Sequence, residues 1–187
     1  MKTKDLAYIA LFAAITAVLG LVPAIAVGPV PITAQTLGVM LAGAILGARR
    51  GFLSQLLFLV LVAIGLPLLA SGAGGLAVFA GPTAGYLFSW PVAAFVVGLL
   101  TERFWARYNL AWGIVANVVG GILVIYAIGV PVLAAVADLS PGTAIVSGAL
   151  PFLVGDGIKA VVAAVVAVAV RRAYPVIERP RRAPVAP

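Results

Sequence analysis

Long apolar stretches, separated by short connectors, constrain this chain more than any other feature of its sequence. They cover residues 6–27, 32–48, 52–70, 83–101, 110–130 and 147–170. An α-helix needs about 20 predominantly apolar residues to cross a bilayer. Only 9% of the residues are charged, whereas soluble domains contain about 25%. We therefore predict an all-α, polytopic integral membrane protein with six transmembrane helices that form a single domain over residues 1–172.

The remaining residues, 173–187, form a basic, proline-rich tail that we expect to lie in the cytoplasm. With so much of the chain inside the membrane, little is left for a soluble domain. Any nucleotide-driven step is therefore expected to come from another polypeptide.

The basic residues lie on one side of the predicted bundle. If the N-terminus is inside, eleven of the twelve fall in inner segments: Lys2, Lys4, Arg49, Arg50, Arg103, Arg107, Arg171, Arg172, Arg179, Arg181 and Arg182. The positive-inside rule then places both termini in the cytoplasm. The net charge of +7 is accounted for by topology, so nucleic acid is not an expected partner. We predict a multi-pass protein of the bacterial cytoplasmic (inner) membrane.

The twelfth basic residue, Lys159, lies with Asp156 inside the last apolar stretch. An ionisable side chain at the centre of a membrane helix costs about 2.5–3.5 kcal/mol on insertion scales. Positions i and i+3 share one helix face, so both side chains can point into the same interior cavity. The pair indicates either a binding or transport site or a buried ion pair that fixes helix packing.

Other polar and aromatic residues gather in the predicted outer half of the bundle. They are Thr33, Gln35 and Thr36, then Thr83, Tyr86 and Trp90, and Tyr126. Together with the charged pair they suggest a small-molecule site with mostly apolar walls. The glycine-rich segment 71–82, which contains Gly74 and Gly75, is interpreted as a mobile outer loop over that site. It lacks the ending of a phosphate-binding loop. The alternative is that the segment is an ordinary turn-rich connector.

The sequence argues against catalysis and metal binding. It contains no histidine and no cysteine, which removes the usual general base and the usual zinc ligands. We expect no enzyme activity, no metal and no cofactor.

The first apolar stretch carries a row of small residues, Ala7, Ala10, Ala14 and Ala17. Small residues at helical spacing allow another helix to approach closely. This face is predicted either to dock a partner membrane subunit or to pack within the chain itself.

The order of several short motifs is similar to that of a known family. The motifs are Pro31-Ile-Thr-Ala-Gln-Thr-Leu-Gly38, Gly47-Ala-Arg-Arg-Gly51, Gly81-Pro-Thr-Ala-Gly-Tyr86 and Gly155-Asp-Gly-Ile-Lys159. Over residues 6–170 the chain resembles the BioY family, the biotin-specific S components of energy-coupling-factor (ECF) ABC transporters. The resemblance implies a six-helix subunit that captures biotin outside and works with a T component and two ABC ATPase subunits. Association with further copies of itself is left open.

The resemblance also implies which residues meet the ligand. Asp156 can accept an N–H of the ureido ring while Lys159 donates to an oxygen, or Lys159 can pair with the valerate carboxylate. Trp90, Tyr86 and Phe79 can pack on the apolar parts of biotin. Thr33, Gln35, Thr83, Gly74 and Gly75 complete the predicted site. The alternatives are an S component for another vitamin, an autonomous ion-coupled permease and an assembly protein with a structural ion pair.

Overall fold

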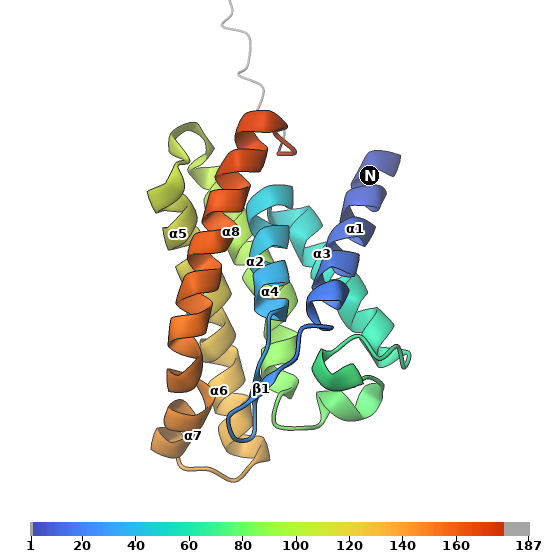
Figure 1. The fold of residues 1–187 in the computed structure, drawn as a ribbon, viewed down its shortest axis with the longest axis vertical. Coiled ribbons are helices and arrows are strands. Elements are labelled where there is room, and N and C mark those ends of the chain that lie inside the picture. Colours follow the sequence, from blue (N-terminus) through green and yellow to red (C-terminus); the bar gives the residue numbers. More distant parts are fainter. Residues whose placement is uncertain (1, 178–187) are drawn as a thin grey trace, which may run out of the picture.

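The structure, a computed structural model, describes residues 2–177 and is mostly helical in that range (Figure 1). The long helices are α1 (Thr3–Leu19), α2 (Gln35–Leu46), α3 (Ala48–Ala63), α4 (Ala84–Arg103), α5 (Leu110–Val118), α6 (Ile125–Val136), α7 (Pro141–Gly148) and α8 (Leu153–Ala173). Two short strands, β1 (Ile25–Ala26) and β2 (Pro31–Ile32), follow α1. The all-α fold class predicted from the sequence is confirmed.

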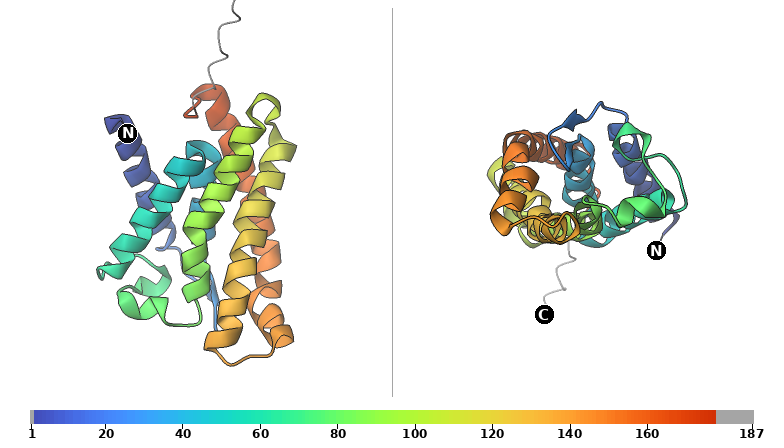
Figure 2. Two further views of the ribbon diagram at one scale, coloured as in Figure 1. Left: turned by 180° about the vertical axis from the view of Figure 1, so that it is seen from behind. Right: turned by 90° about the horizontal axis from the view of Figure 1, so that it is seen from below.

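When α5 is taken together with α6, and α7 with α8, the helices run alternately up and down, so the connectors collect at two ends of the bundle (Figures 1 and 2). The start of α1, the turn between α2 and α3, the connector between α4 and α5, and the end of α8 share one end. The strands, α7 and the connector 64–83 occupy the other. That connector holds the short helices η1 (Ala70–Gly72) and η2 (Leu76–Phe79). The exposed Arg49, Arg103 and Arg172 belong to the first end, and we refer to it as the basic end.

The first predicted helix is too long at its C-terminus. We expected it to reach residue 27, but α1 ends at Leu19, and β1 then pairs antiparallel with β2. The reason is local chemistry: Pro29 and Pro31 lack the N–H that a continuing helix needs, and Gly28 takes a φ of 86° in the turn. The second helix, expected from residue 32, accordingly begins only at Gln35.

Helices α2 and α3 are joined by a single residue, which the prediction of a separate connector around Arg49 and Arg50 did not anticipate. Gly47 has a φ of 86°, so the chain reverses without a loop. The Ala48 N–H donates to Oε1 of Glu102 on α4 at 2.9 Å, which satisfies one free donor at the start of α3. Both arginines therefore lie inside α3, and the helix we expected from residue 52 begins at Ala48.

The predicted loop 131–143 is also mostly helical. Pro131 lies within α6, and α7 begins at Pro141, where Ser140 caps it by accepting from Thr143 N. Proline is tolerated inside membrane helices because neighbouring groups satisfy the freed carbonyl. Between α5 and α6 the chain forms a π-helical segment, η4 (Val119–Val124), so residues 110–136 make one continuous rod.

Three of the described helices are long and apolar enough to cross a membrane. They are Ala84–Arg103, Leu110–Val136 and Pro141–Ala173, the last of which includes the short helix η5 (Leu150–Phe152). Helix α2 is apolar but has only 12 residues, which is about 18 Å. Helices α1 and α3 have 17 and 16 residues.

The predicted tail begins in the described part of the chain and packs back on the bundle. Ile177 is buried, and the carbonyl of Val176 accepts from Nη2 of Arg50 at 2.9 Å. The rest of the tail, residues 178–187, lies outside the described residues.

Close contact between α3 and α4 depends on Gly98, and replacing it is expected to be costly. A Cβ there would lie 2.3 Å from the backbone nitrogen of Ala48, which cannot move without displacing α3. We expect Gly98→Ala to destabilise the protein by about 1–3 kcal/mol. Thermal unfolding in detergent measures the effect. Gly157→Ala on α8 is the control, because nothing lies within 4 Å of its Cβ. Equal unfolding temperatures of the two variants would contradict the packing argument.

Candidate functional site

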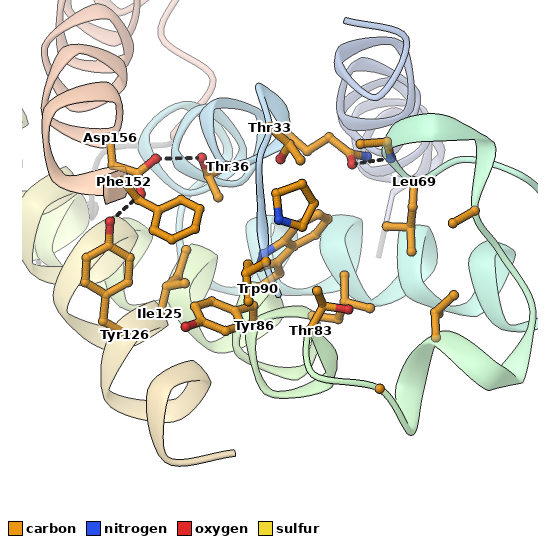
Figure 3. Close-up of a pocket in the computed structure, with 18 of the residues that line it drawn as sticks. Thr33, Thr36, Leu69, Thr83, Tyr86, Trp90, Ile125, Tyr126, Phe152 and Asp156 are labelled. Carbon is orange, nitrogen blue, oxygen red and sulfur yellow. Dashed lines mark hydrogen bonds between the residues drawn. The ribbon is translucent and has the colours of Figure 1, made fainter. Parts of the chain in front are cut away.

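A cavity of about 260 Å³ lies in the half of the bundle opposite the basic end (Figure 3). The strand β2 and the start of α2 form one side, the connector 64–83 and α4 form another, and α6 and α8 close the third. The residues that line it are Val30, Pro31, Thr33, Gln35, Thr36, Leu69, Ala70, Ala73, Val78, Gly81, Thr83, Tyr86, Leu87, Trp90, Ile125, Tyr126, Phe152, Asp156 and Lys159. Most of this wall is apolar.

Asp156 and Lys159 meet at the cavity wall. Lys159 Nζ lies 2.7 Å from Oδ1 of Asp156. Asp156 as a whole residue is 3% exposed. Thr36 Oγ1 also donates to Oδ1, at 3.1 Å, and Tyr126 OH donates to Oδ2 at 2.7 Å (Figure 3). A buried ion pair is tolerated only when such further hydrogen bonds satisfy its remaining groups.

The two charged groups differ in what they still offer a ligand. The ammonium group of Lys159 has three donors, and all are used: by Oδ1 of Asp156, by Thr36 Oγ1 at 2.9 Å and by the carbonyl of Thr33 at 2.6 Å. A carboxylate has about four acceptor positions. Asp156 uses two of these acceptor positions on Oδ1 and one on Oδ2. Oδ2 can therefore accept one more hydrogen bond from an N–H or O–H without losing a present contact.

Gln35 lines the cavity, but its amide is already committed to the backbone. Nε2 donates to the carbonyls of Thr16 and Leu68, and Oε1 accepts from Ala70 N at 3.1 Å. The side chain is 1% exposed. Gln35 therefore joins α1 to the connector 64–83 and holds that connector against the cavity.

Two aromatic side chains from α4 form the opposite wall. Trp90 is 4% exposed and packs against Phe58 at a centroid distance of 5.6 Å, and its Nε1 is buried with no hydrogen-bond partner among residues 2–177. Tyr86 differs, because its hydroxyl donates to the carbonyl of Gly148 at 2.7 Å. Trp90 thus lines the cavity, but its N–H is enclosed by protein atoms.

Some residues predicted for the site are not at the cavity. Gly74, Gly75 and Phe79 are absent from its wall, where Ala73 and Val78 stand instead. Gly74 packs against the carbonyl of Leu66, where a Cβ would lie at 2.3 Å, and the Gly75 N–H donates to Val62 O at 2.8 Å. The two glycines shape the connector. Phe79 packs against Phe88, with the two tilted rings 5.4 Å apart between centroids.

The structure places the other predicted residues, Thr33, Thr83, Tyr86 and Trp90, on the cavity wall. Thr36 and Tyr126 also line the cavity and form direct hydrogen bonds with the charged pair. The sequence showed both only as polar residues near the outer ends of helices. The apolar wall residues, such as Phe152 and Ile125, carried no signal that distinguished them from other membrane residues.

The alanine row of α1 faces away from the bundle over most of its length. Ala7, Ala10 and Ala14 are exposed, and Ala17 is half-buried against the core around Phe58 and Trp90. The buried face of α1 is formed instead by Ile9, Phe12, Ala13 and Thr16.

Comparison with known proteins gives consistent matches over nearly the whole chain. A biotin transporter BioY of Rhizobium etli is 52% identical over 184 residues, which cover 95% of this chain and 98% of the relative. A biotin transporter BioY of Rhodobacter capsulatus is 50% identical, covering 88% of this chain and 91% of the relative.

The fold also matches a solved structure. A crystal structure of the S-component for biotin from an ECF-type ABC transporter superposes with a TM-score of 0.86 at 33% identity, and covers 92% of this chain and 95% of that one. Residues 1–176 match the model of the BioY family. With its apolar helical bundle and these relatives, the chain belongs to the BioY family of multi-pass membrane proteins.

Proposed function

We propose that the protein is the biotin-binding subunit, or S component, of an ECF-type uptake transporter. The observation that carries the proposal is the charged pair Asp156 and Lys159 at the wall of an otherwise apolar cavity. Biotin has matching chemistry: a ureido group with N–H donors and a carbonyl acceptor, and an apolar ring and chain. The names of the Rhizobium and Rhodobacter relatives and the solved S component support the same ligand.

The free hydrogen-bonding positions favour one orientation of biotin. Asp156 Oδ2 can accept a ureido N–H at no cost to the existing network, whereas Lys159 has no unused donor. We propose that the ureido ring meets Asp156.

Transport requires partners in this proposal. The protein is a multi-pass protein of the bacterial cytoplasmic membrane, and a T component with two ABC ATPase subunits supplies the energy. The exposed residues Ala7, Ala10 and Ala14, with the half-buried Ala17, are the proposed contact with the T component. Small residues on a lipid-facing helix allow the close approach that helix association in membranes requires.

Binding to the purified protein tests the function. Biotin titrated calorimetrically into protein stripped of bound ligand should give a saturable isotherm, and thiamine or riboflavin should give none. A response to another vitamin and none to biotin would identify an S component of different specificity. Uptake by the protein alone in proteoliposomes, driven by a proton or sodium gradient, would instead identify an ion-coupled permease.

The proposed topology is tested by labelling from one side. The basic end should face the cytoplasm because the positive-inside rule assigns it there. A cysteine at Asp138, between α6 and α7, should react with an impermeant maleimide added to intact cells, and one at Arg107 should react only after the cells are opened. Labelling of both positions in intact cells would contradict this orientation.

A further inference from the structure

A second hollow lies on the outside of the bundle, between α3 and α4 near the basic end. It is a groove of about 470 Å³ lined by Arg49, Phe52, Leu53, Val92 and Phe95. The two helices lie side by side (Figure 2). Phe52 and Phe95 contact edge to face at 6.4 Å, and Val92 and Phe95 are 40% and 41% exposed. The groove thus has apolar walls and is open to the surroundings of the bundle.

Arg49, the charged residue in the wall of this groove, has different contacts from its neighbour Arg50. Arg50 is used inside the protein: it pairs with Asp5 at 3.2 Å and donates to the carbonyls of Leu46 and Val176. Arg49 is exposed, and within residues 2–177 its side chain has no hydrogen bond or ion pair. A free guanidinium group therefore lies beside an apolar groove.

This arrangement matches the two parts of one kind of molecule. A guanidinium group binds phosphate oxygens through paired N–H donors. Basic positions between membrane helices at the cytoplasmic side bind anionic lipid head groups. From Arg49 in the first turn of α3, the apolar residues continue along both helices, as the acyl chain of a lipid does.

We propose that the groove between α3 and α4 binds an anionic phospholipid, with the phosphate group on Arg49 and an acyl chain against Phe52, Leu53, Val92 and Phe95. The site is separate from the cavity that holds Asp156 and Lys159, because no residue lines both. It lies at the basic end, so the lipid belongs to the leaflet on that side of the membrane.

Native mass spectrometry of the detergent-solubilised protein tests this site. Phosphatidylglycerol and phosphatidylcholine with identical acyl chains are titrated separately, without biotin. We expect the first molecule of phosphatidylglycerol to bind more tightly than the first molecule of phosphatidylcholine. Arg49→Gln should weaken phosphatidylglycerol binding about fivefold and weaken phosphatidylcholine less, because the choline cation of that lipid already compensates the charge of its phosphate. Phe95→Ala should weaken both lipids, because it removes part of the wall that the acyl chain contacts.

Arg103→Gln is the matched control. Arg103 is also exposed at the basic end and lies on α4, but outside the groove, so its removal changes the net charge equally. An unchanged lipid preference in Arg49→Gln, or an equal loss in Arg103→Gln, would overturn the proposal. So would a change in the proportion of dimers in Arg49→Gln without a change in lipid binding, which would assign the groove to a second copy of the chain. Unfolding temperatures verify that all variants are folded.

Discussion

Asp156→Asn and Lys159→Ala are each expected to weaken biotin binding by about 2–5 kcal/mol. In either variant one charge stays in the protein interior without its partner. Lys159→Ala also removes the hydrogen bonds from Lys159 to Thr33 and Thr36. Asp156→Asn removes the negative charge of the carboxylate that accepts a hydrogen bond from Tyr126. Calorimetric titration of biotin into each purified variant measures the change.

A double variant separates binding from folding. Asp156→Asn combined with Lys159→Met removes both charges and leaves similar volumes, which buried ion pairs often tolerate without loss of stability. We expect this protein to unfold near the wild-type temperature and still bind biotin poorly. Near-native affinity in the folded single or double variants would show that the pair holds the helices together and does not contact the ligand.

The same variants report the orientation of biotin. Its carboxylate can be converted to an amide, which removes the negative charge at that end. If the ureido ring meets Asp156, the amide should lose the same affinity in wild type and in Lys159→Ala. If the amide binds more weakly than biotin in wild type but equally well in Lys159→Ala, the biotin carboxylate contacts Lys159. Once the lysine is absent, the charge of the carboxylate no longer contributes to affinity.

The second large effect concerns coupling to the energy-supplying subunits. Ala10→Trp and Ala14→Trp are expected to abolish stable association with the T component and ATP-dependent uptake, while biotin binding persists. Both alanines are exposed on α1, so an indole ring fits without disturbing the bundle but holds a partner helix away. Co-purification, uptake and biotin titration should be measured on the same preparations.

Ala127→Trp provides the control for this experiment. Ala127 is an exposed alanine on α6, far along the chain from α1, so its replacement adds the same bulk to the lipid-facing surface. It should leave association intact. Undisturbed association in the α1 variants would place the docking surface elsewhere. Loss of biotin binding in them would show that the alanine row supports the fold of this subunit itself.

Parts of the fold could be predicted because they depend on patterns with a direct physical cause. The apolar stretches predicted the helices, and the spacing of Asp156 and Lys159 predicted that both face one cavity, where they lie 2.7 Å apart. The helix ends were harder. Hydropathy cannot separate a helix from extended apolar residues, so residues 20–27 and 32–34 were assigned to predicted helices although this region holds a β-hairpin.

The site shows the same division. Thr36 and Tyr126 bond Asp156 from α2 and α6, which are distant in sequence, and only the packing of the helices brings them together. Gly74 and Gly75 were assigned to the ligand, whereas their contacts with Leu66 and Val62 shape the connector. A glycine-rich motif indicates an unusual backbone, but the sequence does not tell whether a ligand or another part of the chain requires it.

The π-helical segment Val119–Val124 has a consequence for how such a chain can change during evolution. A π-turn contains an additional residue relative to an α-turn. Winding the same residues as a regular α-helix, with none deleted, would rotate everything beyond the segment by about 100°. Tyr126 would then turn away from Asp156 although every side chain of the cavity remained encoded. Substitutions that favour regular α-helical winding in this segment should therefore be rare among descendants that keep the same ligand, unless one residue is deleted with them.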